Sequence, residues 1–187
     1  MDPALEIVDV LLIGGRSGAG KSSVGWEVAA RLRAADVAHA FIEGDVLDAV
    51  HPAPEGDPDR SLLTERNLAA LWANYAAIGC RRLVYTNTAS VMASEEWMFL
   101  KALSGPGGRY QVRITRALLT ATDATVRVRL TAREQGSERE RQLRRSAFMA
   151  GLLERRVPEG APRYATDGRT VVEVASEVAT SWLARTG

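Results

Sequence analysis

Hydrophobic residues follow two alternating spacings along the first part of the chain, one typical of strands and one typical of helices. Residues 7–13 form a short run rich in β-branched side chains, which ends at Gly14 and Gly15. Such a run predicts a strand buried on both faces of a parallel sheet. Residues 22–35 carry apolar side chains at helical spacing, and residues 38–43 have the pattern of a second strand. Together these elements predict a βαβ unit with a glycine-rich turn.

The same alternation continues to the end of the chain. After a proline-rich loop at residues 51–59, the pattern predicts strands over residues 82–86, 110–119 and 163–166 and helices over residues 61–79, 94–103, 122–133, 139–156 and 170–185. We therefore expect an α/β fold, a three-layer sandwich in which helices cover both faces of a five-stranded parallel sheet. Since no repeat or linker interrupts the pattern, residues 1–187 are expected to form a single domain.

Composition narrows the class of protein. Hydrophobic residues make up 46% and charged residues 25% of the chain, as in an ordinary globular protein. A net charge of +1 gives no strong field to attract nucleic acid or an anionic membrane. The one cysteine, Cys80, permits neither an internal disulfide nor a cysteine-based zinc site. No apolar run is long enough to span a membrane and the start lacks a basic stretch, so we expect a cytoplasmic protein.

The segment from Gly15 to Ser22 carries the strongest chemical signal in the sequence. It fits the pattern G-x-x-x-x-G-K-[S/T], and it lies between a predicted strand and a predicted helix, as a phosphate-binding loop requires. Its glycines let backbone amides approach an oxyanion, and the helix N-terminus adds positive partial charge. The residues expected to bind the nucleotide are Gly15, Arg16, Ser17, Gly18, Ala19, Gly20, Lys21, Ser22 and Ser23.

Two side chains of this loop have specific expected tasks. Lys21 can reach the β- and γ-phosphates of a nucleoside triphosphate, and the hydroxyl of Ser22 can ligate Mg²⁺. ATP and Mg²⁺ are therefore the expected cofactors. A glycine-rich turn that matches the pattern by chance is the alternative, and the flanking strand and helix argue against it.

Two carboxylates follow the second predicted strand, in the segment Glu43-Gly44-Asp45. Because the carboxyl ends of parallel strands open into one crevice, both are expected to face the phosphate-binding loop. One carboxylate can hold Mg²⁺ through water, and the other can accept the proton of an attacking hydroxyl. Asp45 as a simple helix cap after a turn glycine is the alternative.

With the phosphate-binding loop, Glu43-Gly44-Asp45 resembles the corresponding segment of a group of P-loop small-molecule kinases. The group includes shikimate kinase, gluconate kinase, adenylylsulfate kinase and chloramphenicol phosphotransferase. The resemblance implies the P-loop NTPase fold, with strand order 2-3-1-4-5. It also implies that Asp45 orients or deprotonates the acceptor hydroxyl and that Glu43 supports the metal. Several of these kinases have aspartate where this chain has Glu43, so the metal role departs from their pattern.

The end of the third predicted strand agrees with this resemblance. Many motor and switch NTPases place an acid there, whereas this chain continues with Thr86-Asn87-Thr88. The missing acid argues against an efficient ATPase, and the small-molecule kinases commonly lack it too.

Arginine is concentrated around the break Gln135-Gly136-Ser137. The resembling kinases place a mobile lid at this point, here about residues 134–146, whose arginines close over the phosphates. A guanidinium suits this task because its fork matches phosphate oxygens and stays ionised. Arg133 and Arg139 are the expected catalytic arginines. The other arginines near the break, less easily separated, are Arg127, Arg129, Arg141, Arg144 and Arg145.

Two alternatives for these arginines are a solvated helix face paired with neighbouring glutamates and a nucleic-acid patch. The near-neutral charge of the whole chain and the lack of interleaved aromatic residues argue against nucleic acid.

The resemblance also assigns residues around the two substrates. It places the turn at Asp167 beside the adenine, although an ordinary loop explains this turn equally well. Arg60 and Arg66 are candidates to bind the acceptor. Aromatic residues that can wall the acceptor pocket, or belong to the core, are Trp72, Tyr75 and Trp97.

The function expected from the sequence is an ATP-dependent phosphotransferase acting on a hydroxyl group of a small molecule, such as a sugar acid or an antibiotic. The protein is expected to be a monomer or a homodimer. The alternatives are a nucleoside or nucleotide kinase, a nucleotide-binding regulatory protein with little turnover, and a kinase that acts on nucleic-acid ends.

Overall fold

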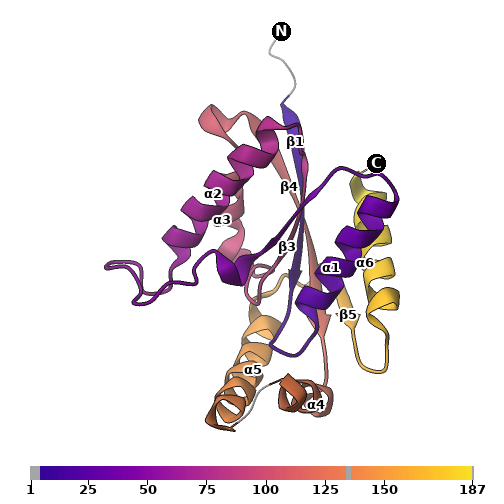
Figure 1. The fold of residues 1–187 in the computed structure, drawn as a ribbon. Helices are drawn as coiled ribbons and strands as arrows, with labels where there is room; N and C mark the ends of the chain where they lie inside the picture. The colour runs from indigo at the N-terminus through magenta and orange to yellow at the C-terminus, as the bar shows by residue number, and fades with distance from the viewer. Residues whose placement is uncertain (1–4, 134–135, 187) are drawn as a thin grey trace.

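The structure, a computed structural model, describes residues 5–133 and 136–186. Its centre is a sheet of five parallel strands in the order β2-β3-β1-β4-β5, as expected (Figure 1). The strands are β1 (Glu6–Gly14), β2 (Ala40–Glu43), β3 (Arg82–Thr86), β4 (Tyr110–Thr120) and β5 (Arg163–Ala165).

Helices cover both faces of the sheet and its lower end (Figure 1). The helices α1 (Lys21–Ala34) and α6 (Val171–Thr186) pack on one face, and α2 (Ser61–Ala77) and α3 (Glu96–Leu103) pack on the other. Two further helices, α4 (Asp123–Arg133) and α5 (Gly136–Arg156), lie at the end where the strands finish. Short 3₁₀ turns are η1 (Gly44–Val46), η2 (Ala93–Glu95) and η3 (Pro106–Gly108). None of the helices within the described residues is long and apolar enough to cross a membrane.

The side chains of β1 alternate between two hydrophobic clusters. Val8, Val10 and Leu12 belong to the cluster beneath α2 and α3, whereas Leu11 and Ile13 belong to the cluster beneath α1 and α6. Successive side chains of a strand point to opposite faces, so a strand covered on both faces is apolar along most of its length. This explains why residues 7–13 are apolar except at Asp9, which is buried and paired with Arg113 of β4.

Three neighbouring strands end at the same level of the sheet. Ile13 of β1 pairs with Thr86 of β3, and Thr86 pairs in turn with Glu43 of β2. The chain therefore leaves β1, β2 and β3 side by side, at the lower end in Figure 1. This register brings the phosphate-binding loop, the turn η1 and the segment after β3 to one place.

The structure differs from the prediction at the start of one strand and at the start of one helix. The prediction began the second strand at residue 38, but β2 begins at Ala40, and the imidazole Nδ1 of His39 is bonded to the carbonyl oxygen of Val37 over 2.7 Å. The prediction began a helix at residue 139, but α5 begins at Gly136. Glycine is tolerated at a helix start, where the backbone needs no intrahelical hydrogen-bond donor.

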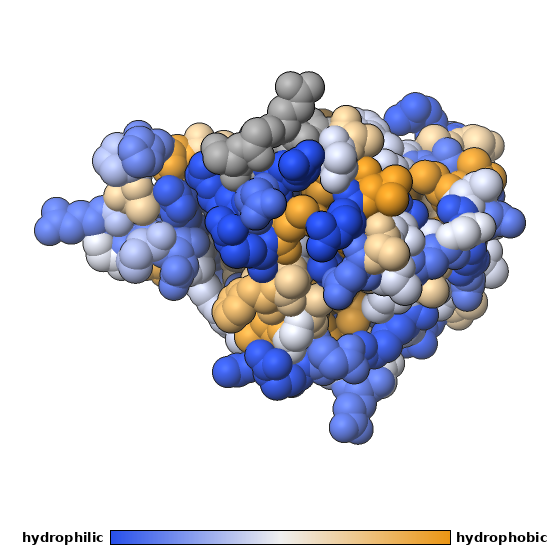
Figure 2. Space-filling view, turned by 90° about the horizontal axis from the view of Figure 1, so that it is seen from below, coloured by the Kyte–Doolittle hydropathy of each residue, from blue (hydrophilic) through white to orange (hydrophobic). Residues whose placement is uncertain are grey.

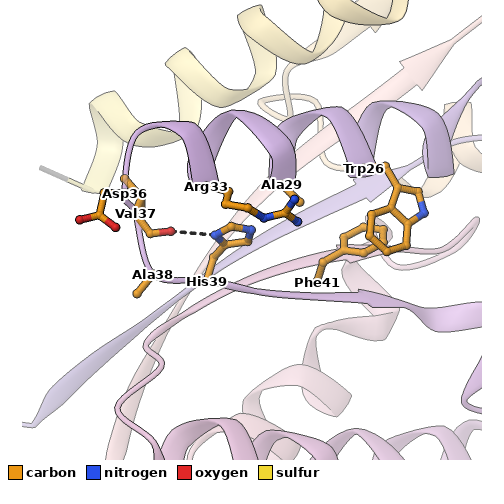
Figure 3. A pocket seen from close by; sticks show the side chains of 8 residues that line it. All are labelled: Trp26, Ala29, Arg33, Asp36, Val37, Ala38, His39 and Phe41. Atoms are coloured by element: carbon orange, nitrogen blue, oxygen red, sulfur yellow. Dashed lines mark hydrogen bonds between the residues drawn. The ribbon is translucent and has the colours of Figure 1, made fainter.

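A groove of about 400 Å³ lies between the second half of α1 and the start of β2 (Figure 3). Its aromatic wall is Trp26, which is 54% exposed, and Phe41, with ring centroids 4.3 Å apart. His39 and Arg33 lie between this aromatic pair and Asp36 in Figure 3. The groove lies at the starting end of β2, whereas the phosphate-binding loop lies where the strands finish, so it is not part of the nucleotide site.

The packing of α1 against β3 predicts the effect of replacing Gly25 with alanine. A Cβ atom at this position would lie 2.5 Å from Cγ2 of Thr86 and 2.8 Å from Cε2 of Phe41. Overpacking of a core costs about 1–3 kcal/mol, which outweighs the gain of up to about 1 kcal/mol in helix propensity. We expect Gly25→Ala to lower the free energy of unfolding, measured by urea denaturation.

Gly151→Ala in α5 is the matched control. The nearest atom to its added Cβ is the flexible guanidinium of Arg155, at 3.3 Å. We expect this variant to raise the free energy of unfolding by about 0.5–1 kcal/mol. Equal effects of the two substitutions would contradict the close approach of α1 to β3.

Candidate active site

The loop between β1 and α1 has the backbone of a phosphate-binding loop. Gly15, Gly18 and Gly20 have φ angles of 146°, 85° and 98°, a region that side chains disfavour. A Cβ on Gly15 would also lie 2.6 Å from the carbonyl oxygen of Leu119, because the loop crosses close over the end of β4. Space around Gly20 is open, with no atom within 4 Å of a Cβ placed there. The loop is thus packed against the protein on one side and open on the other.

The N-terminus of α1 begins directly at this loop. Gly20 occupies the N-cap position in a left-handed conformation, without a side-chain cap, and the amide of Val24 donates to the carbonyl oxygen of Gly20 over 2.9 Å. The amides ahead of Val24 have no intrahelical acceptor and carry the positive end of the helix dipole. Ser22 and Ser23 are exposed at this helix end. The arrangement suits the binding of a phosphate group.

Lys21 folds back over the loop. Its Nζ lies 3.4 Å from the carbonyl oxygen of Arg16, and its side chain is half-buried. The ammonium group thereby stays beside the loop amides, where a phosphate oxygen would sit. The expected task of Lys21 at the β- and γ-phosphates stays a prediction.

Arg129 of α4 holds the outer side of the loop. Its guanidinium donates to the carbonyl oxygen of Gly18 over 3.0 Å, and to the hydroxyl and carbonyl oxygens of Thr166 over 2.9 Å and 3.0 Å. Because its guanidinium satisfies the carbonyl oxygen of Gly18, this part of the loop is held against α4. The sequence placed Arg129 among seven arginines near the break, but nothing in the pattern singled it out.

Arg16 joins the loop to both α4 and α5. Its side chain is 7% exposed, donates to the hydroxyl of Ser146 over 2.8 Å and pairs with Asp123. The hydroxyl of Ser146, which is fully buried, donates to the carbonyl oxygen of Ser17 over 2.8 Å. Arg16 was expected to bind the nucleotide, and in the structure its side chain faces these two helices. No pattern in the sequence indicated Ser146, which lies 130 positions from Arg16.

Asp45 lies in the turn η1 and is bonded to the segment after β3. The Nδ2 of Asn87 donates to Oδ1 of Asp45 over 2.7 Å. The backbone amide of Asn87 donates to the carbonyl oxygen of Ile13, and the amide of Gly15 donates to that of Thr88, over 3.3 Å and 3.4 Å. Asp45 is therefore linked to the start of the phosphate-binding loop through Asn87 and Thr88. Since η1 has no side-chain cap, the alternative role of Asp45 as a helix cap has no support here.

Gly44 between the two carboxylates is required by a close approach to Tyr85 of β3. A Cβ at Gly44 would lie 2.2 Å from the Tyr85 hydroxyl oxygen. Burial of Tyr85, together with the charges of Asp45, Asp48 and Glu95, raises the pKa of its hydroxyl. Tyr85 therefore stays neutral, and Asp45, Asp48 and Glu95 form an acidic rim around it.

Asp48 belongs to this rim. Burial, followed by the charge of Asp45, raises the pKa of Asp48, and the nearby Arg60 and Arg145 act in the opposite direction. The Nε of Arg60 also donates to the carbonyl oxygen of Val50 over 3.2 Å. Arg60, one of the two arginines expected to bind the acceptor, thus lies at the edge of the same region.

Arg66, the other arginine expected to bind the acceptor, lies in the second turn of α2. It is exposed, and a position two residues before the buried Leu68 puts it on the other side of the helix. The contact of Arg66 with an acceptor stays a prediction.

The expected metal residues flank the loop. Glu43 is half-buried at the end of β2, and Ser22 is exposed at the start of α1. Their hydroxyl and carboxylate oxygens are hard donors of the kind that Mg²⁺ prefers. Among the described residues, no group of three or more acidic, histidine or cysteine side chains is arranged to hold a metal ion by itself. A metal at this site would need phosphate oxygens and water as its other ligands.

Asp167 joins the turn after β5 to the start of α4. Hydrogen bonds from the side chains of Thr125 and Thr122 and the amide of Thr122 lower the pKa of Asp167 to about 2. The carboxylate accepts from the Thr122 amide over 3.0 Å and from the Thr122 hydroxyl over 2.7 Å. Asp167 therefore fixes the turn after β5 against the N-terminal end of α4. Its contact with an adenine stays a prediction.

The predicted lid coincides largely with the start of α5. Residues 136–146 are helical, and Arg139 is half-buried there. Residues 134 and 135 lie outside the described part of the chain, and Arg133 is described only by its backbone, as the last residue of α4. Figure 2 looks onto this end of the molecule and shows hydrophilic side chains around a smaller hydrophobic area.

No family model matches this sequence, and no curated protein matches it. Solved structures are similar in fold along nearly the whole chain. A gluconokinase from Sinorhizobium meliloti 1021 is 21% identical, with 97% of this chain and 94% of that chain covered and a TM-score of 0.60.

A shikimate kinase from Acinetobacter baumannii in complex with shikimate is 17% identical, with coverage of 96% and 94% and a TM-score of 0.54. An APS kinase from Mycobacterium tuberculosis in complex with AMPPNP and APS is 19% identical, with coverage of 97% and 99% and a TM-score of 0.52. At these identities the likeness establishes the fold. The chain has the fold of the P-loop small-molecule kinases, so the resemblance seen in its phosphate-binding loop is confirmed at the level of the fold.

Proposed function

We propose that the protein is an ATP- and Mg²⁺-dependent phosphotransferase that moves the γ-phosphate of ATP to a hydroxyl group of a small molecule. The observation that carries the proposal is the connection of Asp45 to the phosphate-binding loop through Asn87. A phosphate-binding loop alone serves any nucleoside triphosphatase. A carboxylate held beside it can also take the proton of an alcohol, which phosphoryl transfer to a metabolite requires.

The similar structures support a small acceptor. All three are kinases by name, and two of them hold shikimate or APS. The acidic rim formed by Asp45, Asp48 and Glu95 offers acceptors for the hydrogen bonds of a hydroxylated compound. A sugar acid, an antibiotic or a similar metabolite is the proposed class, with Arg60 and Arg66 as proposed acceptor contacts.

The proposed reaction is a single transfer. Residues 15–23, with the ammonium group of Lys21, hold the phosphates, and Asp45 accepts the proton of the acceptor hydroxyl. The hydroxyl oxygen forms a bond to the γ-phosphorus, the bond from this phosphorus to the bridging oxygen breaks, and ADP leaves. Most of the rate enhancement comes from positioning and from fixed positive charge around the transferred group.

Other residues are proposed to neutralise or orient the nucleotide. Mg²⁺, when bound by Ser22 and supported by Glu43, would neutralise charge on the β- and γ-phosphates. Arg133 and Arg139, at the junction of α4 and α5, are the proposed arginines that stabilise the transferred group. Asp167 is proposed to lie in the turn beside the adenine.

Transfer of label from γ-labelled ATP tests the function directly. The wild-type protein is incubated with MgATP and a panel of sugar acids, other small hydroxylated metabolites and antibiotics, and labelled products are separated. We expect Asp45→Asn to lower kcat for the accepted compound by about 10²–10⁴-fold, because general base catalysis is lost, while MgATP still binds.

Asp59→Asn, in the exposed loop before α2, is the matched control and is expected to keep the wild-type rate. Binding of MgATP without transfer to any acceptor would favour a nucleotide-binding regulatory protein. Transfer that persists in Asp45→Asn would exclude Asp45 as the base.

The contact between Arg129 and the loop predicts a loss of nucleotide affinity. Without its guanidinium, the carbonyl oxygen of Gly18 loses its donor and the loop amides are less firmly oriented. We expect Arg129→Ala to weaken MgATP binding by about 10–100-fold, or about 1.4–2.8 kcal/mol, in isothermal titration calorimetry.

Arg127→Ala, an exposed arginine two positions earlier on α4, provides the comparison. Arg127→Ala removes the same charge as Arg129→Ala but leaves the loop contact in place. The dissociation constant of this variant for MgATP should therefore stay close to that of the wild type. Equal weakening by both substitutions would show that general charge, rather than the contact with Gly18, determines nucleotide affinity.

A further inference from the structure

We infer that Asn87 is the positioning residue that sets the direction of the Asp45 carboxylate relative to the phosphate-binding loop. The inference rests on the proposed function, since the direction of the Asp45 carboxylate affects the reaction only if Asp45 acts on an acceptor. Asn87 itself does not contact the reacting atoms. It acts through Asp45, by one hydrogen bond of 2.7 Å between its Nδ2 and Oδ1 of the carboxylate.

The orientation of the Asn87 side chain is fixed by its own segment. Its Oδ1 accepts a hydrogen bond of 2.9 Å from the amide of Ala89. An amide side chain has its oxygen on one side and its NH₂ group on the other, so the partner at Ala89 decides which group faces Asp45. With the oxygen bound to a backbone donor, the NH₂ group must face the carboxylate.

The backbone of the same segment is tied to β1 and to the loop. The amide of Asn87 donates to Ile13, and the carbonyl oxygen of Thr88 accepts from Gly15. The hydroxyl of Ser90, which is 2% exposed, donates to the carbonyl oxygen of Asn87 over 3.2 Å. Asn87 therefore spans the distance between the loop that holds the phosphates and the carboxylate that meets the acceptor.

The single bond to Oδ1 leaves the second carboxylate oxygen for the acceptor. Within the described part of the chain, Oδ2 of Asp45 has no hydrogen-bond partner, and Asp45 is exposed to solvent. Because Asn87 holds one oxygen in place, the other points in one direction. A misplacement of about 1 Å in such a constellation can lower a rate by about 10²-fold.

The choice of asparagine also explains why no acid follows β3. A carboxylate at residue 87 would stand about 3 Å from that of Asp45, and two like charges at this distance repel each other. An arginine would pair with Asp45 through its fork and could occupy both carboxylate oxygens. A neutral donor avoids the repulsion and uses only one oxygen.

The other ionisable groups around Asp45 come from different elements and do not replace this contact. They are Asp48 after η1, Tyr85 of β3, Glu95 of η2, and Arg60 and Arg145, which act on Asp48. Among residues 5–133 and 136–186, Asn87 alone donates a hydrogen bond to the Asp45 carboxylate.

The rate test uses Asn87→Ala and Asn87→Asp with the acceptor that the labelled-ATP panel identifies. We expect Asn87→Ala to lower kcat by about 10–100-fold with little change in the dissociation constant of MgATP. Asn87→Asp keeps an oxygen for the amide of Ala89, so it preserves the segment, but it replaces the donor by a repelling charge. We expect it to lower kcat at least as much.

The fold of each variant is checked by its melting temperature, and Asn74→Ala is the matched control. Asn74 is exposed on α2 and donates to the carbonyl oxygen of Ala70, so its loss removes one asparagine hydrogen bond away from the site. A wild-type kcat in Asn87→Asp would show that Asn87 only supports the segment, and it would overturn the inference.

A spectroscopic measurement tests the contact without any acceptor. In ¹H–¹⁵N spectra, the side-chain amide resonances of Asn87 are expected to move in Asp45→Asn and to stay in place in Asp59→Asn. Unmoved resonances in Asp45→Asn would overturn the inference. If they move but the wild type transfers phosphate to no compound, the proposed function fails while the contact between Asn87 and Asp45 stands.

Discussion

The candidate site depends on one constraint, the register that ends three parallel strands at the same level. Ile13, Thr86 and Glu43 lie side by side across β1, β3 and β2. If β3 were shifted by one residue, its side chains would exchange faces and Tyr85 would leave the cluster that it shares with Phe99. The two hydrophobic clusters therefore fix the register, and the register fixes where the chain turns toward phosphate and acceptor.

The helices α4 and α5 complete this site by holding the loop from outside. Arg129 binds its carbonyl oxygens, and Ser146 binds both the carbonyl oxygen of Ser17 and the side chain of Arg16. Amides that are already oriented need little reorganisation when charge develops on a phosphate, which is the main source of electrostatic catalysis. Because Ser146 lies in α5, two hydrogen bonds join this helix to the loop.

The sequence predicted the parts of the site that are local, and it missed the parts that depend on distant contacts. The phosphate-binding loop and the strand order follow from a short motif, a hydrophobic pattern and a resemblance. The bond between Asn87 and Asp45 joins residues 42 positions apart, and it exists only because β2 and β3 are neighbours with level ends. The contact of Arg16 could not be predicted from the sequence for the same reason, since its partner Ser146 is an ordinary helix residue that no pattern distinguishes.

The pairing of β2 with β3 explains why no acid is needed directly after β3. The acid that could have stood there is replaced by a donor, and the carboxylate comes from the neighbouring turn, where Gly44 allows the chain to pass over Tyr85. Positive groups then gather around the loop, and Asp45, Asp48 and Glu95 gather around Tyr85. Because an acidic rim repels phosphates and the loop attracts them, the proposed function gives the nucleotide and the acceptor separate places in this charge distribution.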